Sequence, residues 1–434
     1  MMATSSTTRA QSAGLLALVM SPAVIIFVSS NFVNVGNLAF NMIFSRWMGP
    51  ELFGDLAIVL TIKLAFLGVF GAVSSAVSHR VAALKADDAA QTDQALARLN
   101  RICFAALWFA LPVVALAIFA GSLQTRLDLG SPYLLYILLG SVPFSAPLNI
   151  LRGVALGRMN SAKIVYSANV EMAARLGLGM IFWQLGMGIE GVVAAIAVSI
   201  IAGWAVLIDV LPQPKLPVVP VRPVAASLGL AALPFALLQI AQVAALDGDI
   251  FLATYFLGDV ETGYVAALSL FQRIQFFACF SLASVLLPSV VIALRDGHSY
   301  RTNVGMIAGL LAVVSVTVLS LSILVPDLLL TVLVGANYTA AAPHLVWAAA
   351  AAVVFTLNYL IATLLMAQGS RSGIVVVIAG AGLQVALMIA VLSTPSGGLA
   401  EMLATKFFCQ IGVLSVLSVQ LWLTSLTQLQ KVTK

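Results

Sequence analysis

Twelve apolar stretches, each close to the length of a membrane span, constrain this chain more than any other feature of its sequence. About 20 apolar residues in a helix cross the roughly 30 Å hydrocarbon core of a bilayer, and stretches of that length recur here with short polar breaks. Hydrophobic residues form 62% of the chain, whereas soluble domains are about half apolar. We therefore predict an all-α polytopic membrane protein of about 12 transmembrane helices. The predicted spans have their cores at 14–44, 52–79, 102–121, 132–156, 163–184, 189–210, 224–257, 262–294, 303–325, 341–367, 373–394 and 400–424.

The second half of the chain repeats features of the first. Residues 49–57, Gly-Pro-Glu-Leu-Phe-Gly-Asp-Leu-Ala, align with residues 258–266, Gly-Asp-Val-Glu-Thr-Gly-Tyr-Val-Ala, at an offset of 209 residues. Three matches in the same order at nearly the same offset indicate a duplicated half. The other two matches pair Asn31, Asn34 and Asn41 with Gln239, Gln242 and Asp249, and Leu156-Gly157 with Gln368-Gly369.

A proline-rich break separates the two halves. Residues 211–223 contain five prolines and two cations, which is typical of an extended linker. We expect an N-terminal six-helix bundle over 1–210 and a C-terminal six-helix bundle over 224–434.

Lysine and arginine residues concentrate in alternate breaks, and this pattern predicts the orientation. Cytoplasmic loops retain positive charge, so we expect a multi-pass protein of the plasma (inner) membrane with both termini and the linker in the cytoplasm. The start of the chain has one basic residue, Arg9, and no convincing cleavage site, so we interpret it as a retained first helix. The same topology accounts for the net charge of +5 without a nucleic-acid partner.

No enzymatic motif accompanies the spans. The sequence has neither a phosphate-binding Gly-x-x-x-x-Gly-Lys-Ser/Thr loop nor His-Glu-x-x-His, and its three cysteines lack metal-ligand spacing. Asp247-Gly-Asp249 has the Asp-x-Asp form that some glycosyltransferases use, but it is a two-residue pattern in a chain whose external breaks are short. We predict that the chain is not an enzyme and uses no cofactor or metal.

Amide side chains share one face of the first predicted span. At 100° per residue, Asn31, Asn34, Asn37 and Asn41 fall within an arc of roughly 120°. They either bond neighbouring helices, as is common in membrane bundles, or line a water-filled cavity. The recurrence of the pattern in the seventh span favours the cavity; the residues there are Gln239, Gln242 and Asp249.

Cations lie within spans of both halves. A cation at the depth of Lys63 costs about 2.5–3.5 kcal/mol on insertion scales, and its counterpart in the repeat is Gln272, next to Arg273. This favours a shared polar interior, with snorkelling or local pairing as the alternative. Arg152 is expected to snorkel, and Lys406 is expected close to the outer interface.

The fifth predicted span carries an acid and a base. Glu171 and Arg175 are four residues apart, so they lie on one helical face and can pair. Ionisable residues within a membrane are candidate functional sites; a structural ion pair is the alternative.

One ten-residue segment resembles a known family. Residues 45–54, Ser-Arg-Trp-Met-Gly-Pro-Glu-Leu-Phe-Gly, resemble the opening motif of polysaccharide-biosynthesis flippases of the oligosaccharide or O-antigen type, in the superfamily shared with multidrug extruders and lipid II flippases. Residues 258–266 resemble its counterpart in the second half. The specific motif covers about ten residues in each half, and the helix arrangement covers nearly the whole chain. Asp55 departs from the aliphatic or aromatic residue expected after the glycine.

This resemblance implies two six-helix bundles around a central cavity, which move a polyprenyl-pyrophosphate-linked oligosaccharide outward for cell-surface polysaccharide or lipopolysaccharide biosynthesis. The implied partners are this lipid-linked substrate, membrane lipids and, in a biosynthetic complex, polysaccharide polymerase or assembly proteins. Cations in the cavity would attract the diphosphate, and amides would bond sugar hydroxyls. Glu171, Arg175 and Asp249 are candidates for coupling to protons or sodium. The candidate substrate-binding residues are Asn31, Asn34, Asn37, Asn41, Lys63, Gln239, Gln242, Gln272 and Arg273.

Two other functions remain open. A multidrug or small-cation extruder of the same fold would favour an acidic, aromatic cavity, against which Lys63 and Arg273 weigh. A membrane glycosyltransferase or polymerase is disfavoured by the short external breaks.

Overall fold

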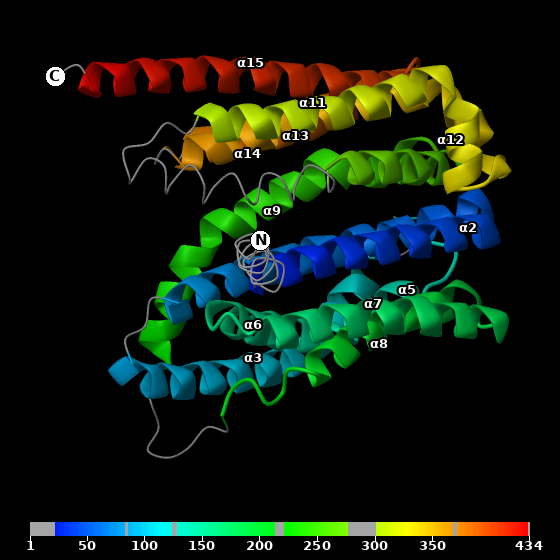
Figure 1. Ribbon diagram of the computed structural model, residues 1–434. Coiled ribbons are helices and arrows are strands. Elements are labelled where there is room, and N and C mark those ends of the chain that lie inside the picture. The colour runs from blue at the N-terminus through cyan, green and yellow to red at the C-terminus, as the bar shows by residue number, and fades with distance from the viewer. Residues whose placement is uncertain are drawn as a thin grey trace, which may run out of the picture. The chain divides into compact units, whose positions relative to one another are not determined.

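The computed structural model describes residues 22–82, 86–123, 127, 129–212, 221–276, 301–367, 370 and 372–432. Helices account for the regular structure in these ranges, which contain no strand (Figure 1), and the predicted all-α class is confirmed. The elements are α2 (Pro22–Ala82), α3 (Ala86–Ala120), α5 (Leu134–Leu139), α6 (Val142–Gly157), α7 (Ser161–Gln184), α8 (Gly188–Ala205), α9 (Arg222–Phe256), a helix over 259–276, α11 (Arg301–Leu324), α12 (Pro326–Leu333), the 3-10 helix η1 (Ala336–His344), α13 (Leu345–Ala367), α14 (Ser372–Leu392) and α15 (Leu399–Val432).

Each of the twelve predicted spans lies mostly in helix where the chain is described; the fourth is divided between α5 and α6, and the sixth is helical only as far as Ala205. By length and hydropathy, eight helices of the described ranges can cross a membrane, or nine if the bent pair α11 and α12 counts as one span. The start of the first span, the end of the eighth and most of the 211–223 linker lie outside the described residues. The chain is thus a multi-pass membrane protein.

Glycines interrupt the helices at equivalent places in the two halves. Gly49 has φ 74° and breaks α2 between the first and second predicted spans, and Pro50 follows it. Gly258 has φ 111° and separates α9 from the helix over 259–276. A positive φ favours glycine, which has no β-carbon to clash with the backbone. These two residues are the ones that the internal repeat pairs, so the geometry supports the duplication.

The chain divides into two compact units. The N-terminal unit comprises Met1–Phe40, Phe66–Leu123 and Ser131–Ala236, and the C-terminal unit comprises Asn41–Ala65, Gln124–Gly130 and Leu237–Lys434. These boundaries differ from the domain boundaries read from the sequence, because the middle of α2 belongs to the C-terminal unit.

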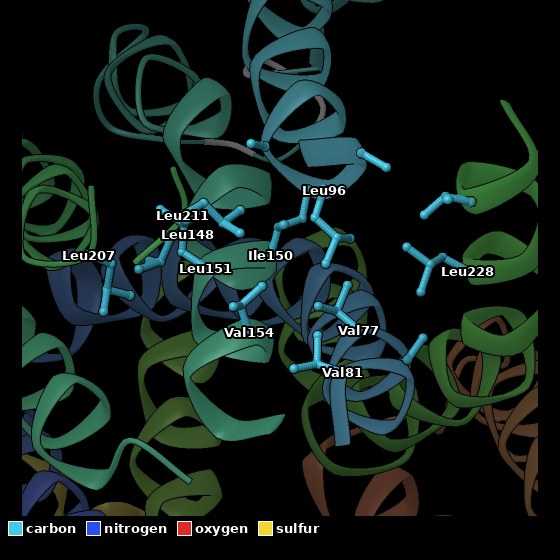
Figure 2. Packing of buried hydrophobic residues seen from close by; sticks show 14 of the residues in the cluster. Val77, Val81, Leu96, Leu148, Ile150, Leu151, Val154, Leu207, Leu211 and Leu228 are labelled. Atoms are coloured by element: carbon cyan, nitrogen blue, oxygen red, sulfur yellow. The ribbon is translucent and has the colours of Figure 1, made fainter. Parts of the chain in front are cut away.

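The N-terminal unit has a continuous apolar core. Side chains from the end of α2, from α3, α6 and the start of α9 meet there, as Figure 2 shows. Gly153 and Gly157 of α6 face the backbone of α2, where added β-carbons would lie 2.5 Å from Ser74 O and 2.7 Å from Ser78 O. Small residues at this spacing let membrane helices approach closely. The labelled core residues are Val77, Val81, Leu96, Leu148, Ile150, Leu151, Val154, Leu207, Leu211 and Leu228.

The C-terminal unit packs α15 against α13 and α14, and α11 against α13. Two short elements were not predicted: α12 follows the ninth predicted span, and η1 runs into the start of the tenth. The chain turns by 103° from α11 into α12, with Pro326 at the first turn of α12. Proline fits this position because it needs no amide donor there.

Candidate functional site

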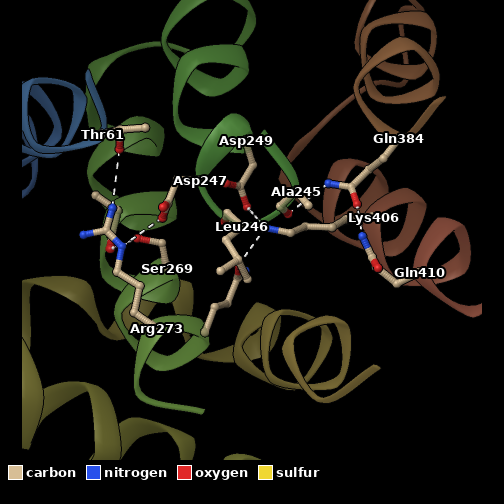
Figure 3. A network of polar contacts seen from close by, with 12 residues as sticks. Thr61, Ala245, Leu246, Asp247, Asp249, Ser269, Arg273, Gln384, Lys406 and Gln410 are labelled. Atoms are coloured by element: carbon tan, nitrogen blue, oxygen red, sulfur yellow. Dashed lines mark hydrogen bonds and ion pairs between the residues drawn. The ribbon is translucent and has the colours of Figure 1, made fainter. Parts of the chain in front are cut away.

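Lys406 is the centre of a buried polar cluster in the C-terminal unit (Figure 3). Its ammonium group, on α15, donates to Asp249 Oδ2 at 2.6 Å, to Gln272 Oε1 at 2.6 Å and to the carbonyl oxygen of Leu246 at 2.8 Å. Lys406 and Asp249 are each 1% exposed. An ammonium group has three donors, and these contacts use all three. The side chain of Lys406, which was expected close to the outer interface, is enclosed by protein.

A second ion pair involves Asp247, two residues before Asp249 on α9, and Arg273, which follows Gln272. Arg273 Nε is 2.9 Å from Asp247 Oδ1, and Arg273 Nη2 is 3.4 Å from Thr61 Oγ1 on α2. Figure 3 shows both ion pairs, with Arg273 next to Asp247 and Lys406 next to Asp249. Asp247 thus pairs with Arg273, and Asp249 pairs with Lys406.

A chain of amides extends the cluster into α14, α15 and α13. Gln384 donates to the carbonyl oxygen of Ala245 at 3.1 Å, and Gln410 donates to Gln384 Oε1. Asn358 donates to Gln410 Oε1 at 2.8 Å. Buried amides are costly unless they are bonded, so these bonds fix four helices in one register.

The remaining predicted residues of the C-terminal unit are buried or half-buried on α2 and α9. Lys63 is 3% exposed and is two residues from Thr61, and Asn41 is 8% exposed. Gln239 and Gln242 on α9 are half-buried. The Oε1 atom of Gln242 is buried and has no hydrogen-bond partner among the described residues.

The N-terminal unit holds a separate cluster around Glu171 on α7. Arg152 of α6 forms an ion pair with Glu171 at 2.9 Å and bonds Ser167 Oγ at 3.0 Å. Ser167 in turn donates to the carbonyl oxygen of Gly203 on α8. The expectation that Arg152 snorkels is wrong, because its guanidinium binds a carboxylate of a neighbouring helix.

Arg175 joins the same cluster from the next turn of α7. Its guanidinium donates to Asn37 Oδ1 and lies 5.8 Å from the centre of the Phe40 ring, within the range of a cation–π contact. Arg175 also interacts electrostatically with Glu171 and with Arg152. Glu171 therefore lies between two arginines, where the sequence predicted one.

The predicted site residues thus fall into two groups. Asn37, Glu171 and Arg175 meet in the N-terminal unit. In the C-terminal unit Asp249 and Gln272 meet at Lys406, and Arg273, which follows Gln272, pairs with Asp247. Asn31 and Asn34 are half-buried on α2. Arg152 and Lys406 were not predicted as site residues. The position of Gln410 four residues after Lys406 in an apolar helix is the signal that marks a polar face on α15.

The motif over 45–54 has a structural role within the C-terminal unit. Arg46 donates to the carbonyl oxygens of Met42 and of Val332, at the end of α12. The hydroxyl group of Tyr338 in η1 donates to the carbonyl oxygen of Ser45 at 3.0 Å. Asp55, which departs from the family pattern, accepts from the amide of Gly130 at 3.0 Å. The motif therefore anchors α12 and η1.

Comparisons with known proteins identify the fold. No family model and no curated protein matches the sequence. Among solved structures, a multidrug resistance MATE family transporter of the MOP superfamily matches in its inward-facing conformation with TM-score 0.73 and 14% identity, over 91% of this chain and 96% of that one. An outward-facing MATE transporter of that superfamily matches with TM-score 0.64 and 15% identity, over 95% and 96%. The inward closed lipid II flippase MurJ matches with TM-score 0.67 and 13% identity, over 92% and 87%. The chain therefore has the fold that MATE transporters and the lipid II flippase MurJ share.

Proposed function

We propose that this protein is a flippase that moves a polyprenyl-pyrophosphate-linked oligosaccharide across the plasma (inner) membrane by alternating access, in the biosynthesis of cell-surface polysaccharide or lipopolysaccharide. Its two halves rock against each other as repeats of such transporters do, with both termini and the 211–223 linker in the cytoplasm. The fold serves a multidrug transporter and a lipid flippase alike, so the choice of substrate depends on the charges of this chain.

The buried cations of the two units carry the proposal. In the N-terminal cluster, Arg152 and Arg175 accompany the single carboxylate of Glu171. In the C-terminal unit the buried or half-buried cations Lys63, Arg273 and Lys406 lie in the same unit as the carboxylates of Asp55, Asp247 and Asp249. A diphosphate loses its hydration on entering a membrane and needs positive charge in return. The cavity of a small-cation extruder needs negative charge instead.

Amide side chains on α2 and α9 can bind the sugar part of the substrate. Asn31, Asn34 and Asn37 on α2, and Gln239 and Gln242 on α9, can donate to and accept from hydroxyl groups. The unpartnered Oε1 atom of Gln242 is an acceptor that a sugar hydroxyl would satisfy.

Export by variants of the two predicted diphosphate ligands tests the proposal. Lys63→Ala should abolish complementation of a flippase-deficient strain, whereas Lys63→Arg should retain part of it. Because Arg273→Ala alone would leave Asp247 buried without its cation, the informative variant is Arg273→Ala with Asp247→Asn. It removes the ion pair as a unit, and it too should abolish export at normal expression.

Arg101→Ala provides the matched control, since Arg101 is an exposed cation on α3; it should export normally. The proposal is wrong if Lys63→Ala and the Arg273–Asp247 double variant both complement at normal expression. Export of small organic cations by the parental protein, with no transport of lipid-linked glycan, would favour the extruder instead.

A further inference from the structure

Helix α12 lies across the direction of the helix that precedes it. The chain turns by 103° from α11 into α12 (Figure 1), and α11 corresponds to the ninth predicted span. Membrane helices tilt by about 20° on average from the bilayer normal, so a helix that makes this turn at the end of a span lies close to the plane of the membrane. In the predicted topology, α12 is at the outer surface.

Arg46 and Trp47 of α2 indicate the depth at which α12 ends. The exposed guanidinium of Arg46 donates to the carbonyl oxygens of Thr331 and Val332. Its contacts are all with backbone carbonyl oxygens, so its charge has no carboxylate partner among the described residues, and such a charge is costly in the hydrocarbon core. Trp47 is exposed beside it, as tryptophan is where membrane and water meet. The end of α12 therefore lies at the level of the lipid headgroups.

The exposed side of α12 has a polar strip and an apolar strip. At about 100° per residue, Asp327 and Thr331 lie on one strip, and Leu328 and Val332 lie on the next. Leu328 is 59% exposed and Val332 is 51% exposed, whereas Leu330 is buried against the protein. A helix that lies in the membrane interface has these two strips, because one contacts water and the other contacts lipid.

The end of α12 is held against α2. Gly335, two residues after α12, has φ 112°, and a β-carbon there would be 3.3 Å from Cγ of Arg46. The backbone thus packs closely against the Arg46 side chain. In η1, the hydroxyl group of Tyr338 donates to the carbonyl oxygen of Ser45 at 3.0 Å. These contacts fix which side of α12 is exposed.

We propose that α12 is an interfacial helix that docks the C-terminal unit on the phospholipids of the outer leaflet. Leu328 and Val332 lie among the upper parts of the acyl chains, and Asp327 and Thr331 face water. Arg46 is a positioning residue that holds the end of the helix at the headgroup level. This inference concerns a surface outside the two polar clusters and does not depend on the substrate, so it goes beyond the proposed function.

Fluorescence of a nitrobenzoxadiazole label on single cysteines tests the inference. The full-length protein, in a variant without other cysteines, is reconstituted into phosphatidylcholine vesicles at a low protein-to-lipid ratio. A label at Leu328→Cys or Val332→Cys should emit at shorter wavelength than a label at Asp327→Cys or Thr331→Cys. Lipids with a nitroxide near the ester end of the acyl chain should quench most of the fluorescence of the first pair, and aqueous iodide should quench the second pair. All four side chains are exposed, so the substitutions leave the core intact.

Three results would overturn the inference. Stronger quenching at Leu328→Cys by a nitroxide at the methyl end of the acyl chain would place α12 deep in the bilayer, as part of a re-entrant segment. Emission at short wavelength that no lipid nitroxide quenches would mean that protein, such as a second copy of the chain, covers α12. Quenching of all four labels by iodide alone would place α12 in water.

Arg46→Ala tests the positioning role. Without the bonds from Arg46, the end of α12 is released, so quenching of the Val332→Cys label by the shallow nitroxide should fall and quenching by iodide should rise. Arg101→Ala removes an exposed arginine of α3 and should change neither signal. Unchanged quenching in Arg46→Ala would overturn the role assigned to Arg46.

Discussion

Gly54 and Gly263 lie backbone to backbone: a β-carbon added to Gly54 would be 3.1 Å from the amide nitrogen of Gly263. The internal repeat pairs these two glycines with each other. The motif of the first half and its counterpart in the second half are thus packed together within the C-terminal unit, and glycine is needed because side chains would separate the two helix starts.

Substitution of Gly263 should disrupt this contact. A β-carbon there would be 2.1 Å from the carbonyl oxygen of Pro50, which is backbone and cannot turn away. Overpacking of this kind typically costs about 1–3 kcal/mol, occasionally more, so Gly263→Ala should lower the yield and the apparent unfolding midpoint of the purified protein. Gly309→Ala in α11 meets open space and should leave both unchanged. An unaltered midpoint for Gly263→Ala would show that the two helix starts separate freely.

The bond from Tyr338 to the motif predicts a smaller effect. The Tyr338 hydroxyl group is buried and donates to the carbonyl oxygen of Ser45, and its ring contacts Phe53 edge to face. Tyr338→Phe keeps the ring contact and removes one hydrogen bond, which contributes about 0.5–1.5 kcal/mol. The apparent unfolding midpoint should fall slightly, and it should fall further in Tyr338→Ala. Equal midpoints for the two variants would mean that the ring contact contributes nothing.

The fold could be predicted from the sequence because its causes are local and repeated. Apolar runs of membrane-spanning length determine the helices, and Gly49 and Gly258 mark the breaks that the repeat predicts. The short α12 and η1 were not predicted because each has too few residues for a recognisable pattern of apolar residues. Their position depends on the bonds from Arg46 to Val332 and from Tyr338 to Ser45, which join parts of the chain almost 300 residues apart.

The partners of the charged residues could be predicted only in part. The spacing of Glu171 and Arg175 indicates a shared helical face, but it cannot reveal Arg152 on another helix. Likewise, the spacing of Asp247 and Asp249 did not reveal that two cations from different helices bind them. Single-sequence patterns report neighbours along one helix; contacts between helices depend on tertiary packing.

The orientation of the chain is a separate prediction. Basic residues concentrate in the breaks on the side of both termini, so a cysteine placed at Gln213, in a variant without other cysteines, should resist a membrane-impermeant thiol reagent in intact cells. The same cysteine should react after the membrane is permeabilised. Labelling in intact cells would reverse the predicted topology.

The last prediction concerns the coupling role proposed for Glu171. If Glu171 alternates between binding a proton and pairing with its arginines, Glu171→Gln should mimic the protonated state. The amide oxygen still accepts from Arg152, so the protein should insert and bind substrate. Transport in reconstituted vesicles should become slower and depend less on the proton gradient. Arg152→Ala instead leaves a buried carboxylate with less compensation, and breaking a buried ion pair costs about 3–5 kcal/mol in soluble proteins, so its expression should fall.

Exchange of the charges separates a proton site from a structural ion pair. Arg152 contacts Glu171 directly at 2.9 Å, so Glu171→Arg with Arg152→Glu restores the ion pair with the two charges exchanged. Glu171→Arg with Arg175→Glu, which exchanges the two charges within α7, provides the comparison. An ion pair needed only for stability should recover expression and transport together in the Arg152 exchange. A positioned proton site should recover expression alone, because the carboxylate then sits on α6 and no longer lies next to Ser167 and Arg175 in the same way. If Glu171→Gln transports at the parental rate and with the same dependence on the proton gradient, Glu171 has no coupling role.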